Sequence, residues 1–529
     1  LPEFLQGRRW FAGKAREIIA TDIEDVIPVE HDGLESAVLV VQVSFASGNP
    51  DAYAVPIMFL QGQPATRARH DKPAAVLADL TLAGANPGAP GVLLDAFTDT
   101  GLAEVLLDAI SRRRSLKGNV GELTATQTRL FKTLRDQGGD HAAAHVLGAE
   151  QSNSSVAFGT RFVMKLIRRL GEGTNPELEI GRFLTTKTAF QHTAPLAGAL
   201  EYHRPRHEPM TVAILQGYVV NEGDAWHYTL DQVKRYFEQA MLRRARGEMP
   251  APPPSGSLDL SATRLPAQPH EVIGAYLETA ALLGQRTAEM HLALASDADD
   301  PAFAPEPFSS LYQRSLYQST RNLTAEAFHL LRDRLADLPQ NIATEANRLV
   351  GSEEQLLRTF HRIVGKRIEA TRTRGHGDFH LGQVLHTGRD FVIIDFEGEP
   401  ARSVSQRRIK RSPLRDVAGM LRSFDYAVHT VLYGPAGLGV IRPEEVPDLE
   451  PLATYWRRWV SASYLAGYLE RARGERAAFI PPGTEQLALL LRILLLEKAT
   501  YELGYELNNR PQWVQIPIRG ILQLLDGQT

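Results

Sequence analysis

The sequence has 529 residues, with 58 lysines and arginines against 62 aspartates and glutamates, and a formal net charge of −4. A chain of this length exceeds one hydrophobic core, so several domains are expected. The balanced charge gives no reason to expect a nucleic-acid partner. The absence of cysteine excludes disulfides, thiolate metal sites and a cysteine nucleophile. Neither a signal-peptide pattern nor an apolar segment long enough to span a bilayer is visible, so we expect a cytoplasmic protein without a membrane partner.

The N-terminal region predicts a small α+β domain. Residues 37–45 and 52–60 are apolar and rich in valine and alanine, and a Gly48-Asn49-Pro50 turn separates them. This pattern is typical of a β-hairpin. Residues 85–91 are rich in glycine and proline and predict a boundary loop. We therefore expect a first domain over residues 1–88 and an intermediate segment over 89–140.

The next region predicts strands followed by a helix. Between Val146 and Ile167 the pattern is strand, loop, strand, tight turn and strand. A proline and two early acidic residues after Asn175 predict a helix start. A further apolar strand is expected over residues 212–220. The expected domains are a β-rich domain over 141–222 and a helical one over 223–529, the latter with a flexible, proline-rich surface insertion at 247–270.

The most informative stretch runs from His376 to Gln383 and continues into a predicted hairpin that ends at Asp395. Phosphoryl transfer needs a carboxylate that orients the attacking hydroxyl and oxygen ligands that hold magnesium. Asp378 fits the first role, and Gln383 and Asp395 fit the second. Glu397 could assist through a water or a second metal ion. The alternative is that Asp378 caps a turn and Asp395 merely ends a strand, but their joint spacing favours phosphoryl transfer.

Lys165 lies inside an apolar strand, where an unpaired ammonium would be costly, so it needs an anionic partner. The stretch from His376 to Gln383 resembles the catalytic loop of kinase-like folds, and this resemblance implies that the lysine holds the α- and β-phosphates of ATP and pairs with a glutamate of the next helix. Glu179 is the first candidate for that partner, and Glu177 is the second. The alternative is a lysine that extends into solvent from an edge strand.

Two further segments are expected to bind ATP. The loop before Lys165 lies where a phosphate-covering loop belongs, although it lacks a Gly-x-Gly-x-x-Gly pattern, and its polar side chains would contact phosphate: Gln151, Ser152 and Ser154. The segment after the strand at 212–220 matches the hinge that meets adenine, with Gln216 and Tyr218 as candidates. An ordinary loop remains the alternative there.

The catalytic stretch resembles the catalytic loop of protein kinases, and more closely the His-Gly-Asp-x-His loop of aminoglycoside kinases and other small-molecule kinases. Over almost its full length the chain resembles bacterial maltokinases. The segments that carry this resemblance are residues 1–14, 377–385, 394–400, 411–420, 498–503 and 505–511.

The resemblance implies an α+β, protein-kinase-like bilobal fold, with a β-rich N-lobe, a helical C-lobe and an extra N-terminal α+β cap domain. It implies transfer of the ATP γ-phosphate to the anomeric hydroxyl of maltose, with ATP and Mg²⁺ required. The product, maltose 1-phosphate, would feed α-glucan synthesis. The resemblance also suggests fusion to, or a complex with, trehalose synthase.

The same resemblance suggests an acceptor site near the C-terminus. Tyr501 and Tyr505 would share one helical face, and Glu502 and Glu506 an adjacent one. Aromatic rings pack on sugars and carboxylates accept hydroxyl hydrogen bonds, although such residues more often serve a helix interface. The remaining candidates are His380 and Arg415 for substrate binding, His376 as a brace of the loop backbone, and Asp416 as a structural support of the catalytic loop.

Two other functions stay open on the sequence alone. A kinase of another small acceptor, such as glucosamine or an aminoglycoside, would keep Asp378, Gln383 and Asp395 but need a different acceptor pocket. A nucleotide-binding pseudokinase that regulates a partner such as trehalose synthase is the second alternative, although no expected catalytic position is missing.

Overall fold

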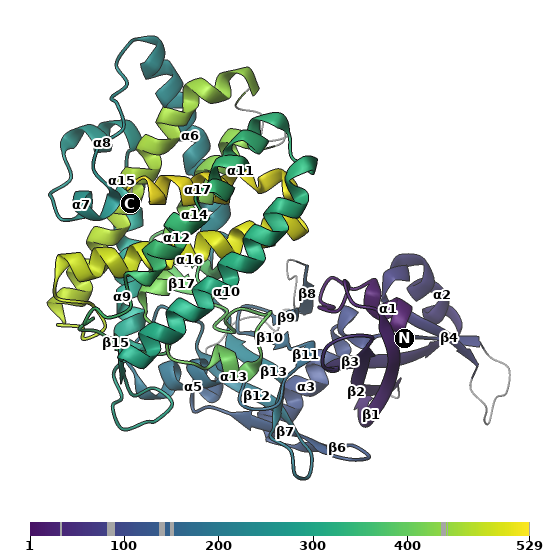
Figure 1. The fold of residues 1–529 in the computed structure, drawn as a ribbon. Coiled ribbons are helices and arrows are strands. Elements are labelled where there is room, and N and C mark those ends of the chain that lie inside the picture. Colours follow the sequence, from purple (N-terminus) through teal and green to yellow (C-terminus); the bar gives the residue numbers. More distant parts are fainter. Residues whose placement is uncertain are drawn as a thin grey trace. The chain divides into compact units, whose positions relative to one another are not determined.

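The computed structural model describes residues 1–31, 34–81, 90–136, 143–148, 153–434, 441 and 443–527. Contacts between Cα atoms divide the chain into two compact units (Figure 1). Unit 1 comprises residues 1–220 and 400–408, and unit 2 comprises residues 221–399 and 409–529. Unit 1 contains two β-sheets and several helices, and unit 2 is mostly helical.

The first sheet of unit 1 contains the predicted hairpin. β1 (Ile18–His31), β2 (Leu34–Phe45) and β3 (Asp51–Gln61) are antiparallel neighbours, followed by β5 (Pro90–Asp95) and β4 (Val76–Thr81). The sheet thus continues past residue 88, the expected domain boundary, because β5 pairs with β3. Residues 85–89 of the predicted boundary loop lie outside the described residues. α1 (Pro2–Gln6) and α2 (Gly62–Asp71) accompany this sheet.

The second sheet of unit 1 is also antiparallel and holds the strands expected around Lys165. Its order is β6 (Ser115–Lys117), β7 (Glu122–Gln127), β12 (Leu196–His203), β13 (Met210–Gly217), β10 (Phe162–Leu166), β9 (Ser154–Phe158) and β8 (Ala144–Leu147).

The predicted helix after Asn175 is α5 (Pro176–Lys187), which packs on β12. The Asn175 side chain accepts a hydrogen bond from the Glu177 N–H, so it acts as the N-cap.

The two sheets of unit 1 share one hydrophobic core. α3 (Gly101–Arg112) contacts β1, β7 and β12 and buries apolar side chains between them. A buried ion pair of Arg168 and Asp95 joins the two halves, with 2.8 Å between nitrogen and oxygen and both side chains 2% exposed. The Trp10 ring lies 4.8 Å from the Arg168 guanidinium. Trp10 therefore has a structural role in this core.

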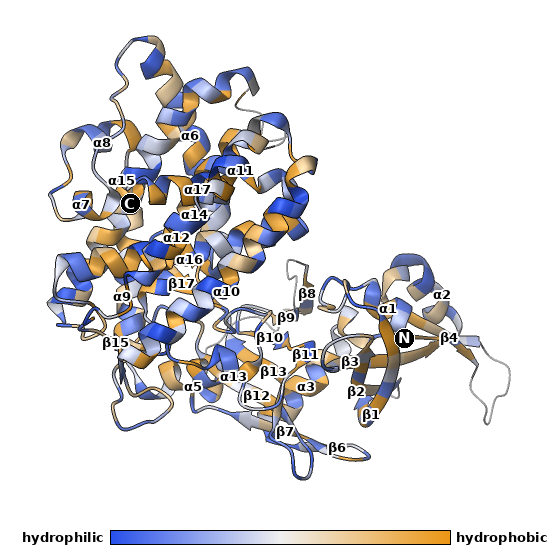
Figure 2. Cartoon of the chain, in the orientation of Figure 1, coloured by the Kyte–Doolittle hydropathy of each residue, from blue (hydrophilic) through white to orange (hydrophobic). Residues whose placement is uncertain are grey.

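Unit 2 is built mainly of helices. Its long helices are α6 (Ala225–Ala245), α9 (Tyr276–Leu294), α10 (Ser310–Arg334), α14 (Leu414–Tyr433), α15 (Val446–Gly474), α16 (Thr484–Asn509) and α17 (Gln515–Leu525). Figure 2 shows hydrophobic and hydrophilic faces on these helices. The apolar run from Leu487 to Leu496 lies within α16 and is mostly buried, as the sequence predicts. No helix in the described ranges combines the length and apolar character needed to cross a membrane.

The shorter elements of the chain connect these helices and sheets. They are α4 (Leu130–Asp136), β11 (Arg169–Leu170), α7 (Ser257–Ser261), α8 (Ala267–Ile273), β14 (Glu306–Pro307), α11 (Gln340–Gly351), α12 (Glu353–His361), β15 (Thr371–Arg372), β16 (Val384–His386), β17 (Phe391–Ile393) and α13 (Val404–Arg407).

The segment 247–270 differs from the expected flexible surface insertion. It contains α7 and the start of α8, and α7 packs against α15. Ser257 is buried, and Arg458 of α15 donates a hydrogen bond to the Pro253 carbonyl. The prolines and serines of this segment therefore lie in turns and at the start of a helix. Composition alone does not distinguish such turns from a flexible chain.

Candidate active site

Asp416, in the first turn of α14, holds the loop that carries Asp378. It is 4% exposed, and its carboxylate accepts hydrogen bonds from the backbone N–H groups of His376 (2.7 Å) and Gly377 (3.0 Å). His291 Nε2 lies 3.1 Å from the same carboxylate. Burial alone would raise the pKa of Asp416, but the bond and charge of His291 outweigh it, and the pKa is lowered. Asp416 thus binds two backbone N–H groups of the loop.

His376 joins this loop to the hairpin that follows it. Its Nε2 donates to the Ile394 carbonyl at 2.8 Å, and its Nδ1 accepts from the Asp378 N–H at 3.4 Å. One tautomer, with the proton on Nε2, satisfies both bonds. His376 therefore connects the backbone at Asp378 with the backbone at Ile394.

The hairpin of β16 and β17 brings the expected metal ligands to its open end. Val384 pairs with Ile393, and the Ile394 N–H donates to the Gln383 carbonyl at 3.0 Å. Gln383 and Asp395 therefore flank the same end of the hairpin. Asp395 has φ of 67°, a left-handed conformation that non-glycine residues rarely adopt. Strain of this kind clusters at functional sites.

The imidazole of His380 lies within electrostatic reach of both Asp378 and Asp395. Burial is the main reason why the pKa of His380 is lowered; Asp378 opposes that shift, and Lys498 adds to it. The ring is therefore neutral at pH 7, and its Nδ1 accepts from the Gly382 N–H at 3.1 Å. The two aspartates that the sequence assigns to catalysis and metal binding both act on the charge of this ring.

Asp395 and Glu397 form an all-oxygen donor pair that fits magnesium. Their carboxylate oxygens lie within 4.8 Å of one another, and Glu397 is buried. Magnesium prefers carboxylate and amide oxygens.

Helix α16 places Lys498 beside Asp378, and it carries Tyr501 next to this lysine. Lys498 Nζ lies 3.6 Å from Asp378 Oδ1 and 5.2 Å from the centre of the Tyr501 ring. The Tyr501 and Tyr505 rings stack with 6.5 Å between centroids, and the Tyr501 hydroxyl bonds with Glu399. Lys498 was not among the expected site residues. Its spacing of three from Tyr501 on a helix was the signal that could have found it.

Glu502 and Glu506, expected to bind substrate, are engaged within unit 2. Glu502 is buried and lies 2.7 Å from Arg422 Nη2, and Glu506 accepts from Arg510 and from the Tyr426 hydroxyl. The bonds with Arg422 and Tyr426 join α16 to α14.

Arg415, also expected to bind substrate, lies 2.6 Å from both carboxylate oxygens of Glu497. Its side chain keeps 23% of its surface exposed.

In unit 1, Lys165 pairs with Glu177, the second of the two candidates. Lys165 Nζ lies 2.8 Å from Glu177 Oε2, and the two side chains are 10% and 2% exposed. Gln216 Nε2 donates to the other oxygen of Glu177 at 3.3 Å. Glu179 instead pairs with Arg408, with 2.7 Å between the nearest atoms. The first choice is corrected because residues two apart on a helix point in nearly opposite directions.

The remaining candidates for nucleotide binding are spread over unit 1. The Ser154 hydroxyl accepts from Arg168 Nε at 3.0 Å, so it supports the buried arginine. The Tyr218 N–H donates to the Arg161 carbonyl at 2.9 Å and follows β13 as expected of a hinge. Gln151 and Ser152 lie outside the described residues.

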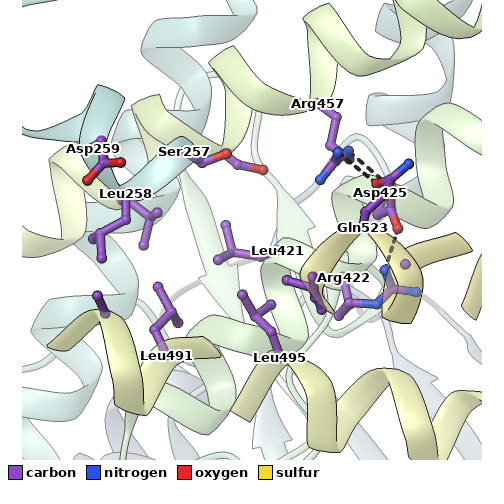
Figure 3. Close-up of a pocket in the computed structure, with 15 residues that line it drawn as sticks. Ser257, Leu258, Asp259, Leu421, Arg422, Asp425, Arg457, Leu491, Leu495 and Gln523 are labelled. Carbon is purple, nitrogen blue, oxygen red and sulfur yellow. Dashed lines mark hydrogen bonds and ion pairs between the residues drawn. The ribbon is translucent and has the colours of Figure 1, made fainter. Parts of the chain in front are cut away.

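A separate cavity of about 120 Å³ lies among α7, α14, α15, α16 and α17 of unit 2 (Figure 3). Leucines line one side, including Leu421, Leu491 and Leu495, and a charged cluster of Arg422, Asp425 and Arg457 lines the other. Asp425 is 3% exposed, and Arg457 Nε lies 3.4 Å from its Oδ1. Apart from Arg422, which pairs with Glu502, this cavity is independent of the candidate active site.

Comparisons with known proteins agree with this architecture. Residues 4–99 match the maltokinase N-terminal cap domain. The chain is 25% identical over 396 residues to a glucosamine kinase of Streptacidiphilus jiangxiensis, covering 71% of this chain and 72% of the relative. It is 24% identical to a glucosamine kinase of Mycolicibacterium smegmatis, covering 81% and 89%.

A solved structure of glucosamine kinase in complex with glucosamine, ADP and inorganic phosphate superposes with a TM-score of 0.59 at 20% identity, covering 96% of this chain and 94% of that one. The chain therefore has a kinase-like bilobal α+β fold with an N-terminal cap domain, which confirms the fold class predicted from the sequence.

Proposed function

We propose that this protein is an ATP- and Mg²⁺-dependent sugar kinase that phosphorylates the anomeric hydroxyl of maltose to give maltose 1-phosphate. The observation that carries the kinase proposal is the loop of Asp378, which Asp416 and His376 fix beside the strained Asp395. The match of residues 4–99 to a maltokinase cap domain supports maltose as the acceptor.

In this proposal Asp378 accepts a hydrogen bond from the anomeric hydroxyl of the acceptor. As the bond between that oxygen and the γ-phosphorus forms, the bond from the γ-phosphorus to the β,γ-bridging oxygen breaks and ADP leaves. The hydroxyl proton passes to Asp378 late in the step and then to solvent. His380 accepts from the Gly382 N–H at Nδ1, so its Nε2 carries the ring proton and can donate a hydrogen bond.

Gln383, Asp395 and Glu397 would hold magnesium, which when bound neutralises the charge of the phosphates. The fit rests on the two carboxylates within 4.8 Å of one another. The amide of Gln383 would add a neutral oxygen donor from the same end of the hairpin.

Residues of unit 1 would hold the nucleotide. Lys165, oriented by its 2.8 Å pair with Glu177, would contact the α- and β-phosphates. The backbone around Gln216 and Tyr218 would meet adenine. Contact of Gln151 and Ser152 with the phosphates stays a prediction from the sequence, whereas the Ser154 hydroxyl accepts a hydrogen bond from Arg168.

The second candidate function is a glucosamine kinase. The names of the two relatives at 24–25% identity and of the superposed structure favour it. Both functions use the same chemistry at Asp378 and differ in the acceptor.

An acceptor screen tests the proposal. The protein would be incubated with MgATP and, in turn, maltose, glucose, glucosamine and kanamycin, and the products followed by phosphorus NMR. A phosphorus doublet coupled to the anomeric proton of maltose is the expected result. A product on glucosamine alone would favour the second candidate. ATP binding without any phosphorylated sugar would contradict both and favour a pseudokinase.

A further inference from the structure

The acceptor side of Asp378 carries a positive charge that the proposed chemistry does not require. Lys498 Nζ lies 3.6 Å from Asp378 Oδ1, and the two side chains are 29% and 27% exposed, so both are accessible to a substrate. The ammonium also lies 5.2 Å from the centre of the Tyr501 ring, a favourable cation–π distance. Carboxylate and ring together hold the ammonium at this place.

The neighbouring acidic groups are already engaged by other partners. On α16, Glu502 is paired with Arg422, and Glu506 with Arg510. Glu399 bonds with the Tyr501 hydroxyl.

An ammonium group of an amino sugar placed near Asp378 would therefore lie close to the positive charge of Lys498. The carboxylates of Glu502 and Glu506 on the same helix already pair with arginines. Like charges at such short range repel strongly where solvent is partly excluded.

Neutral sugars meet a different environment at the same place. Their hydroxyls can accept hydrogen bonds from the Lys498 ammonium and donate to Asp378. The Tyr505 ring, 44% exposed and stacked on Tyr501, offers a flat apolar surface of the kind that packs against a sugar ring.

We propose that Lys498 is a specificity-determining residue, which favours neutral sugars and disfavours acceptors that carry an ammonium group. The proposal rests on the proposed kinase function and deepens it, because it selects between the two acceptor classes that the comparisons leave open.

The test compares Lys498→Met with Lys498→Arg, which keeps the charge. For wild type and both variants, kcat/KM would be measured with maltose, glucose and glucosamine at a pH where the amine of glucosamine is protonated. Glucose and glucosamine differ only in the group on C2, so their ratio isolates the charge. Thermal unfolding of each variant would verify folding, and Lys498→Gln would replace Lys498→Met if that variant does not fold.

We expect wild type to prefer glucose to glucosamine. Lys498→Met should raise the glucosamine-to-glucose ratio at least about tenfold, equivalent to about 1.4 kcal/mol, and Lys498→Arg should keep the wild-type ratio. An equal loss with all sugars would overturn the proposal, because it would indicate a role in the transfer step itself. A wild-type preference for glucosamine would overturn it while leaving the kinase function intact. If no sugar is phosphorylated, the proposed function fails, and this inference with it.

Discussion

The loop conformation depends on one buried carboxylate. Asp416 accepts two backbone N–H groups and the Nε2 proton of His291, so its ionised form is the one that fits. The sequence predicts a structural role for Asp416 but not these partners, although backbone donors in a tight loop need a nearby acceptor.

Replacing Asp378 with Asn should reduce kcat by about 10²- to 10⁴-fold, the usual contribution of a general base. The amide can still accept a hydrogen bond but cannot take the proton. Nucleotide affinity, measured by titration calorimetry with MgADP, should change little because Asp378 acts on the acceptor. The exposed Asp299→Asn variant carries the same chemical change and should keep wild-type turnover. Full turnover in Asp378→Asn would refute the assigned role.

The pKa of Asp416 predicts acid sensitivity. Burial acts to raise this pKa, but the bond and charge of His291 lower it further, so the folded value lies below the ordinary 3.8. The stabilisation is therefore complete above the unfolded pKa of about 3.9 and is lost as pH falls through the lower folded pKa. Between about pH 5 and pH 3, the free energy of unfolding in urea should fall less for Asp416→Asn than for wild type. Equal slopes in both proteins would contradict the linkage.

At the scale of elements, apolar periodicity predicted the strands and helices well, but not which way their polar residues point. The hairpin at 384–393 and the helix after Asn175 follow from turn residues and caps. The partner of Lys165 could not be predicted in this way, because Glu177 and Glu179 both lie in the first turn of α5. Which of them faces the lysine depends on how the helix packs on the sheet. The ion pairs of Glu502 and Glu506 were not predicted for the same reason: helical spacing shows that two residues share a face but not what that face contacts.

The two glutamates of α5 provide a matched pair of variants. Glu177→Gln removes the charge that pairs with the buried Lys165 and should weaken MgATP binding about tenfold, or about 1.4 kcal/mol. It should also lower the melting temperature, because breaking a buried pair is costly. Glu179→Gln, which affects the pair with the half-buried Arg408, should change nucleotide affinity much less. Titration calorimetry would measure both, and the reverse order would contradict the assigned roles.

For the whole molecule, length and composition predicted several domains. In the structure, residues 1–220 belong to one compact unit, although the sequence predicted boundaries at residues 88 and 140 within it. Arg168 and Asp95 form one buried pair although the sequence placed them in different segments. Their coupling could not be predicted, because a buried ion pair between distant residues leaves no local periodicity.

We expect the increase in melting temperature that a bound nucleotide causes to depend on magnesium. A ligand at 100 times its Kd stabilises the native state by about 2.7 kcal/mol. In thermal unfolding, MgADP should therefore raise the melting temperature of wild type, and EDTA should remove most of that rise. Asp395→Asn should show little difference between magnesium and EDTA. A magnesium effect of wild-type size in Asp395→Asn would contradict Asp395 as a ligand.

Residues 400–408 belong to unit 1 although 179 residues of unit 2, from Asn221 to Glu399, precede them in the chain. This segment supplies Arg408 to Glu179 and places Val404 against Gly171, where an added Cβ would lie 2.5 Å from the valine. A ribosome delivers the chain from its N-terminus, so the first 220 residues must wait for this late segment before their last contacts can form. Most of unit 2 has been synthesised when residues 400–408 leave the ribosome. A polypeptide truncated before residue 408 would therefore have an incomplete unit 1.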